Sequence, residues 1–160
     1  MMWIKNGVRN KYIILIFFIL VKIGFQGKNP LTDFRGSGLL GLIHLWKFSL
    51  SDNRANEVFK IASGKETWYF YAATGINFTG KVIQFIEESN CDQFFYENYN
   101  KINLLQFTHL LYAEFFSGFN QFWVNGKFNN IMMVNSLIEE FMDKKAQKIF
   151  LEEIVNRKLF

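Results

Sequence analysis

The chain has 160 residues and a formal net charge of +4, and half of its residues are hydrophobic, with twenty phenylalanines among them. Its length predicts a single domain, and its apolar content excludes an intrinsically disordered chain. The one cysteine excludes an internal disulfide framework and a cysteine-based zinc site, and the scattered basic residues lack the dense stripe that nucleic-acid binding needs.

The stretch YIILIFFILV at residues 12–21 is the most hydrophobic part of the chain, and three basic residues precede it. Ten apolar residues are too few to span a membrane, for which about 20 are needed, and no small-residue cleavage site follows. We interpret the stretch as a buried helix or an artefact of gene prediction, with a secretory signal or membrane anchor as the alternative. We place the domain at residues 20–156 and treat residues 1–19 as a separate apolar segment.

Residues 38–50, GLLGLIHLWKFSL, are expected to form a mostly buried helix. The expected apolar stripe follows spacings of three and four, which is the period of a helix face. The stripe consists of Leu39, Leu42, Ile43 and Trp46.

Two segments follow before residue 73. Asp52 is a plausible N-cap for a helix in NRANEVFKIAS, residues 53–63, and Gly64 would end it. The stretch TWYFYA at residues 67–72 is rich in aromatic residues, so it could be a strand or a buried helix, and its context favours a helix.

Three more helices are expected in the C-terminal half of the chain. Thr79 is a plausible N-cap for the first, residues 104–124 are apolar almost all round, and residues 131–156 form the last. The expected stripes are Val82, Ile83 and Ile86 in the first, Phe107, Leu111, Phe115 and Phe119 in the second, and Val134, Ile138, Phe141, Met142 and Ile149 in the third. In the same helices Glu87 and Glu88 should face water, and Glu140 with Lys144 and Glu153 with Arg157 should form ion pairs. Together these patterns predict an all-α, single-domain helical bundle.

The residue types that often carry chemistry are sparse in this chain. His44 and His109 each lie in an apolar helical run, so we expect satisfied packing residues rather than metal ligands. Cys91 is expected to be a small buried residue rather than a nucleophile. No metal-binding spacing occurs, and we expect neither a metal nor a cofactor.

The segment GFQGKNPLTDFRGSG at residues 24–38 stands apart as a glycine-rich loop. Gly24, Gly27, Gly36 and Gly38 permit positive φ or close backbone approach, and Pro30 stiffens the turn. Its polar residues Thr32 and Asp33 can bond nearby backbone, and Asp33 is close enough in sequence to orient Arg35. Two interpretations stay open: a surface ion pair between Asp33 and Arg35, or an arginine presented to an anion outside the domain.

The stretch IGFQGKNPLTDFRGSGLLGL at residues 23–42 closely resembles the signature of the ELMO domain, in the form found in the ELMO domain-containing (ELMOD) proteins. Further similar stretches follow in order: YFYAATGINFT, LLQFTHLLYAEFFSGFNQFW and IMMVNSLIEEF. The resemblance covers about residues 20–155. It departs at two positions, where Leu20 replaces the signature Trp and Asn29 replaces the signature Asp.

The resemblance implies an all-helical fold and a GTPase-activating protein for Arf or Arf-like GTPases, in which Arg35 is the catalytic arginine finger and Asp33 orients it. It implies no nucleotide site in this chain. The remaining motif residues would shape the loop or contact the partner: Gly24, Phe25, Gln26, Gly27, Asn29, Pro30, Thr32, Phe34, Gly36 and Gly38.

Two alternatives are kept beside this interpretation. The first is a non-catalytic adaptor that works with a Dock-type exchange factor for Rac in phagocytosis, motility and cytoskeletal regulation, as the larger ELMO proteins do. The second is a membrane-anchored or truncated paralogue that uses residues 12–21 as an anchor. We expect a cytoplasmic protein whose basic residues allow peripheral association with membranes.

Overall fold

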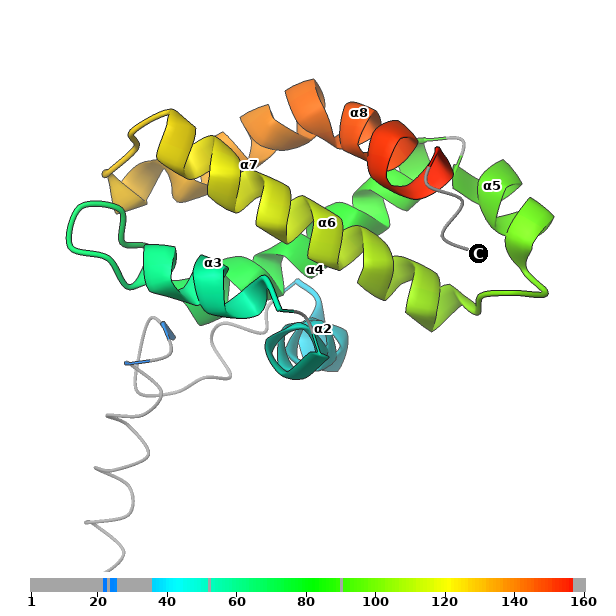
Figure 1. Cartoon of the computed structure of the whole chain (residues 1–160), viewed down its shortest axis with the longest axis horizontal. Coiled ribbons are helices and arrows are strands. Elements are labelled where there is room, and N and C mark those ends of the chain that lie inside the picture. The colour runs from blue at the N-terminus through cyan, green and yellow to red at the C-terminus, as the bar shows by residue number, and fades with distance from the viewer. Residues whose placement is uncertain (1–21, 23, 26–35, 52, 90, 157–160) are drawn as a thin grey trace, which may run out of the picture.

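The computed structural model describes residues 22, 24–25, 36–51, 53–89 and 91–156, and every regular element in these residues is a helix (Figure 1). This confirms the predicted all-α bundle. The elements are α2 (Gly38–Ser51), α3 (Ala55–Ala62), α4 (Tyr71–Glu88), α5 (Cys91–Asn98), α6 (Leu104–Asn125), η2 (Ile131–Met133), α7 (Val134–Phe141), η3 (Met142–Ala146), α8 (Gln147–Ile149) and η4 (Phe150–Val155). No helix in these ranges has both the length and the apolar character needed to cross a membrane.

Helix α6 is the central element of the bundle, as its all-round apolar pattern predicted. It packs against α2, α3 and α4 on one side and against the C-terminal helical segments on the other (Figure 1). Asn103 caps its start, because the Asn103 side chain accepts from the Gln106 N–H and the Gln106 side chain accepts from the Asn103 N–H. Its fully buried side chains include the whole predicted ladder: Phe107, Leu111, Phe115 and Phe119.

Gly75 allows helices α2, α4 and α6 to approach one another closely. A Cβ atom at this position would lie 2.8 Å from Leu45 Cδ1 on α2 and 2.9 Å from Tyr112 Oη on α6. Both distances are shorter than real Cβ contacts, so a side chain here would displace the side chains of Leu45 and Tyr112. Gly75, near the start of α4, thus leaves room for side chains of both α2 and α6.

The predicted buried stripe of α2 is wrong in phase. Leu39, Leu42 and Trp46 are exposed, while the buried face carries His44 and Phe48 together with Leu45. The apolar residues of α2 lie on all of its faces. Spacings of three and four therefore fit more than one face and do not identify the face that packs against the core. In the structure, the face of α2 that carries His44 packs against the core.

The start of α3 and the stretch before α4 also differ from the predictions. The N-cap position of α3 is Arg54, which makes no side-chain cap bond, and Asp52, the predicted cap, lies outside the described residues. The helix ends at Ala62, just ahead of Gly64, as predicted.

Residues 67–70 of the stretch TWYFYA are irregular rather than helical or extended, and α4 begins at Tyr71. The Tyr69 side chain is buried, and its hydroxyl donates to Asn120 Oδ1 at 3.0 Å. In this stretch Tyr69 therefore contacts the core from an irregular segment, whereas Trp68 is exposed.

Thr79 is not an N-cap. Helix α4 starts at Tyr71 and runs through Thr79, whose buried hydroxyl hydrogen-bonds to the His44 ring instead of a helix terminus. Beyond it Val82 is buried, and Glu87 and Glu88 face solvent as predicted. The sequence patterns did not predict α5, where Cys91 is buried as expected.

Residues 131–155 form the expected last helical run, but two π-helical segments, η3 and η4, interrupt it. The predicted pair between Lys144 and Glu140 is present at 2.7 Å, whereas Arg157 lies outside the described residues. The stripe residues Val134, Ile138 and Phe141 are buried, and Met142 and Ile149 are half-buried.

Candidate functional site

The structure describes both ends of the predicted motif loop, at Gly24 and Phe25 and at Gly36 and Gly38. The predicted roles of the other motif residues therefore stay predictions. The residues that lie outside the described part are Gln26, Gly27, Asn29, Pro30, Thr32, Asp33, Phe34 and Arg35.

Gly24 fastens the first end of the loop to the start of α4. Its carbonyl oxygen accepts from the Ala73 N–H at 3.1 Å, and its φ is +85°. A Cβ atom would lie 2.4 Å from the Tyr71 nitrogen, so any side chain here would collide with backbone. Both the φ angle and the contact require glycine, as the sequence predicted for this position.

Phe25 continues from Gly24 into an apolar groove of about 370 Å³ between α2, α3 and α4. Its side chain is 4% exposed and belongs to the hydrophobic core. We call this cavity the apolar groove, and its lining residues include Phe25, Leu42, Trp46, Phe59, Tyr71 and Ala72. The predicted motif residue Phe25 is thus an anchor in the fold.

The second end of the loop also meets α4. The Ser37 hydroxyl donates to the Ile76 carbonyl oxygen at 3.3 Å, and Gly38 begins α2 with a φ of +53°. Gly36 is exposed, and an added Cβ would meet nothing within 4 Å, so the space around it does not require glycine. Gly24 and Ser37, on either side of residues 26–35, are therefore both held to the N-terminal half of α4.

A buried polar cluster lies beneath α2, and the sequence analysis did not find it. His44 Nδ1 hydrogen-bonds to Thr79 Oγ1 at 3.1 Å, and His44 Nε2 lies 3.4 Å from Thr108 Oγ1. His44 is thus a satisfied packing residue, as predicted. The ring of His109, distant in sequence, lies 5.7 Å from the His44 ring, centroid to centroid. No local pattern joins positions on three different helices.

Burial is the main cause that lowers the pKa of His44 to about 4, and the charges of His109 and Lys47 lower it further. The His44 side chain is therefore neutral at pH 7. A neutral ring can accept one hydrogen bond and donate another, which suits its position between two threonine hydroxyls. The cluster holds α2 to α4 and α6 through polar contacts inside an apolar core.

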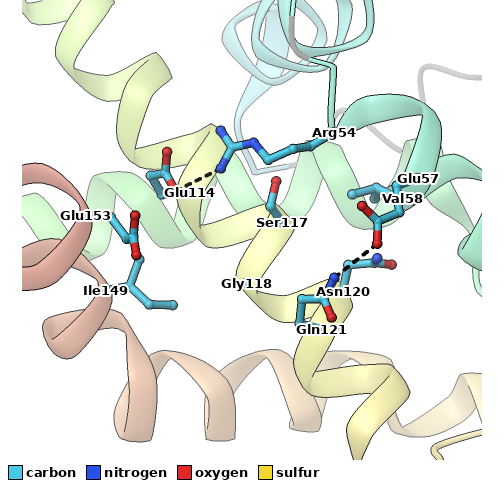
Figure 2. Close-up of a pocket in the computed structure, with 10 residues that line it drawn as sticks. All are labelled: Arg54, Glu57, Val58, Glu114, Ser117, Gly118, Asn120, Gln121, Ile149 and Glu153. Carbon is cyan, nitrogen blue, oxygen red and sulfur yellow. Dashed lines mark hydrogen bonds and ion pairs between the residues drawn. The ribbon is translucent and has the colours of Figure 1, made fainter. Parts of the chain in front are cut away.

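The second cavity is polar, and it lies between α3, α6, α8 and η4 (Figure 2). We call it the polar pocket; its volume is about 370 Å³. Arg54 on the α3 side donates to Glu114 Oε2 on α6 at 2.8 Å, and Gln121 donates to Glu57 Oε1 at 3.3 Å. The side chain of Asn120 lies at the pocket wall and is 1% exposed. The described residues hold no group of three His, Cys, Asp or Glu arranged for a metal ion.

Comparison with known proteins agrees with the resemblance seen in the motif. A model of the ELMO/CED-12 family matches residues 21–138. ELMO domain-containing protein B of Dictyostelium discoideum is 37% identical over 134 residues, which cover 83% of this chain and 46% of that protein. Human ELMO domain-containing protein 2 is 32% identical over 124 residues, which cover 77% of this chain and 42% of that protein. The chain thus spans less than half the length of these relatives, and no solved structure matches it.

Proposed function

The chain belongs to the ELMO/CED-12 family, and on that premise we propose that it accelerates GTP hydrolysis by a small GTPase of the Arf or Arf-like class, with Arg35 supplied in trans as an arginine finger. The observation that carries the proposal is the signature at residues 23–42, in which the arginine is retained. Such an arginine is the feature that the resemblance associates with GTPase activation, as opposed to the adaptor role.

The described ends of the motif loop support this role. Gly24 and Phe25 are held against α4 and in the apolar groove, and Ser37 is held to Ile76 just before α2. A loop fixed at both ends loses less conformational entropy when it inserts into a partner. The fold therefore supplies the anchoring that a finger needs, from residues that have no chemistry of their own.

The proposed contribution of Arg35 is electrostatic stabilisation of the transition state. In phosphoryl transfer, negative charge spreads over the equatorial oxygens of the transferred group, and a guanidinium can donate two parallel hydrogen bonds to them. An arginine supplied in this way raises hydrolysis by about 10³–10⁵-fold, which corresponds to roughly 4–7 kcal/mol of transition-state stabilisation. We assign Asp33 the orienting role, since its carboxylate can hold the guanidinium in position.

The test is single-turnover GTP hydrolysis by a panel of small GTPases with and without the chain. We expect acceleration of at least one Arf or Arf-like GTPase, with Arg35→Ala and Arg35→Lys both returning the rate close to its intrinsic value, because lysine keeps the charge but lacks the planar fork. Arg54→Lys is the matched control, since Arg54 pairs with Glu114 in the polar pocket, and this variant should keep full activity.

Two results would contradict the proposal. One is unchanged acceleration of hydrolysis by the Arg35→Lys variant, which would show that Arg35 is not a catalytic arginine finger. The other is a lack of acceleration across the whole panel together with recovery of a Dock-type exchange factor from cells. That pair of results would favour the adaptor role in Rac signalling instead.

A further inference from the structure

Helix α2 leaves an apolar face open to solvent. Leu39, Trp46 and Leu50 keep 71%, 62% and 69% of their surface exposed, and Leu42 keeps 36%. They follow one another at intervals of three and four residues, so they lie along one side of the helix. We call Leu39, Leu42, Trp46 and Leu50 the α2 outer face. Contiguous apolar surface of this kind on a folded domain marks an interaction site.

The α2 outer face is continuous with the apolar groove, because Leu42 and Trp46 also line the groove. Helix α2 carries a single charged residue, Lys47, so a partner that fits here must itself present an apolar surface. Tryptophan side chains at the centre of such contacts often supply a large share of the binding energy. Trp46 lies where the face and the groove meet, which makes it the natural anchor.

The position of the α2 outer face relative to the motif loop indicates what covers it. The loop segment 26–35 starts from Phe25 in the groove and ends at Gly36, two residues before α2. At full extension three residues span about 11 Å, so the Cα of Leu39 lies within roughly 11 Å of the Cα of Gly36, the residue that follows Arg35 in the chain. Any partner that receives Arg35 must therefore approach the first turns of α2.

The size of an ordinary interface extends this contact along the helix. A stable protein interface buries about 800 Å² on each partner, which corresponds to a disc of roughly 16 Å radius. Such a disc is about 32 Å across, so it can contain Gly36 together with the whole α2 outer face, because Leu39 to Leu50 rise only about 16 Å along α2. In Figure 1, α2 lies at the lower edge of the helical bundle.

We propose that the α2 outer face is the docking surface for the GTPase whose nucleotide receives Arg35, with Trp46 as its anchor. This inference rests on the proposed function, and it separates two tasks within one interface. The outer face supplies binding energy by burying apolar surface, and Arg35 supplies transition-state stabilisation after docking. Substitutions in the two places should therefore change different kinetic constants.

The experiment measures single-turnover GTP hydrolysis as a function of the concentration of the chain, with the Arf or Arf-like GTPase that responds in the panel. For Trp46→Ala we expect the half-saturating concentration to rise at least about tenfold, with the saturating rate within about twofold of wild type. For Arg35→Lys we expect the opposite: a much lower saturating rate and an unchanged half-saturating concentration. Tyr96→Ala is the matched control, since Tyr96 is an aromatic residue 70% exposed on α5, which lies apart from α2 in Figure 1.

A second measurement keeps the docking proposal independent of catalysis. The same GTPase, loaded with the slowly hydrolysed analogue GTPγS, is titrated against wild type, Trp46→Ala and Tyr96→Ala. Weakened binding of Trp46→Ala alone supports the docking surface even if Arg35 proves to have no effect on hydrolysis. Equal binding of all three proteins overturns the docking surface, whether or not the chain accelerates hydrolysis.

Other occupants of the α2 outer face would give different results. If a second copy of the chain covers it, Trp46→Ala will convert a dimer into a monomer in sedimentation velocity and leave the half-saturating concentration unchanged. If residues 12–21 of the same chain cover it, Trp46→Ala will lower the melting temperature and leave GTPase binding unchanged. Either result overturns the proposal.

Discussion

The apolar groove and the polar pocket have the same volume, about 370 Å³ each, and opposite chemistry. In the polar pocket Arg54 forms an ion pair with Glu114, and Gln121 donates a hydrogen bond to Glu57 (Figure 2). In the apolar groove and on the helix beside it, Trp46 and Leu42 stay in contact with water. The polar pocket thus pairs Arg54 and Glu114 within the chain, although Ser117 Oγ and Asn120 Nδ2 in its lining find no hydrogen-bond partner among the described residues, whereas the groove side exposes apolar surface.

The difference indicates at which of the two cavities a partner would gain more binding free energy. A charged ligand at the polar pocket would have to displace existing ion pairs and bonds, whereas a partner at the groove side removes apolar surface from water without such a cost. The groove also holds Phe25, the first core residue of the motif loop. We therefore assign the groove side to function and the polar pocket to the fold. Substitutions on both sides of the molecule test this contrast.

Replacing Gly24 with alanine should disrupt the groove side most strongly. The new Cβ would meet the Tyr71 nitrogen at 2.4 Å, and alanine at a φ of +85° is strained. We expect a loss of about 3 kcal/mol, which for a domain of this size lowers the melting temperature by roughly 6–12 °C. Calorimetry checks this against Gly36→Ala, which meets no neighbour and should stay within about 0.5 kcal/mol of wild type. Equal melting temperatures for the two variants would show that Gly24 does not anchor the loop.

Lowering the pH should loosen α2 from its inner side. His44 has a pKa of about 4 in the folded chain and 6.5 as the ordinary value, so the unfolded chain takes up the proton first as the pH falls. Stability should be complete above about pH 6.5 and fall towards pH 4, by up to about 1.4 kcal/mol per pH unit. Urea unfolding at pH 7, 6 and 5 checks this, and His44→Asn should remove that part of the slope. If the free energy of unfolding changed with pH equally in wild type and in His44→Asn, the assignment of this pH dependence to His44 would be contradicted.

Replacing Arg54 with alanine should weaken the polar pocket and spare the groove side. Glu114, whose side chain is 14% exposed, would lose its guanidinium partner, at a cost that we expect to be about 1–2 kcal/mol. Adding Glu114→Gln to the same protein should recover part of that loss, because the unpaired charge is removed. GTP hydrolysis at saturating concentration should not change in either variant. A fall in the saturating rate would mean that the polar pocket takes part in function.

The smallest expected effect on stability is that of Trp46→Ala. The Trp46 side chain is 62% exposed, so we expect the free energy of unfolding to change by no more than about 0.5 kcal/mol. Urea unfolding beside Tyr96→Ala checks this. A loss well above that of the control would show that Trp46 packs within the folded chain and would remove it as a docking anchor.

Much of the helical architecture could be predicted from local patterns. The apolar run of residues 104–124 identified the central helix, and Gly64 marked the end of α3, because both signals depend on neighbours in the chain. The phase of α2 could not be predicted in this way, since apolar residues occupy both its faces. Thr79 was misread for a related reason: its hydroxyl serves His44, 35 positions away, and no local pattern reports that contact.

In the candidate site, too, local features could be predicted from the sequence and contacts between helices could not. The motif residues could be selected from their composition, and Gly24 behaves as its residue type predicts, with a positive φ and no room for a side chain. The burial of Phe25 in the groove and the exposure of Trp46 depend on how α2, α3 and α4 meet, which sequence spacing does not encode. Arg54 and Glu114 are 60 positions apart, so their pairing was equally hidden.

The most direct test compares the two arginines by the same measurement. Single-turnover GTP hydrolysis by the responsive Arf or Arf-like GTPase is recorded at a saturating concentration of wild type, Arg35→Lys and Arg54→Lys. We predict that wild type and Arg54→Lys accelerate hydrolysis equally, by about 10³-fold or more, and that Arg35→Lys returns it close to the intrinsic rate. Equal acceleration by all three proteins, or loss of acceleration in Arg54→Lys alone, would contradict the assignment of function to the groove side.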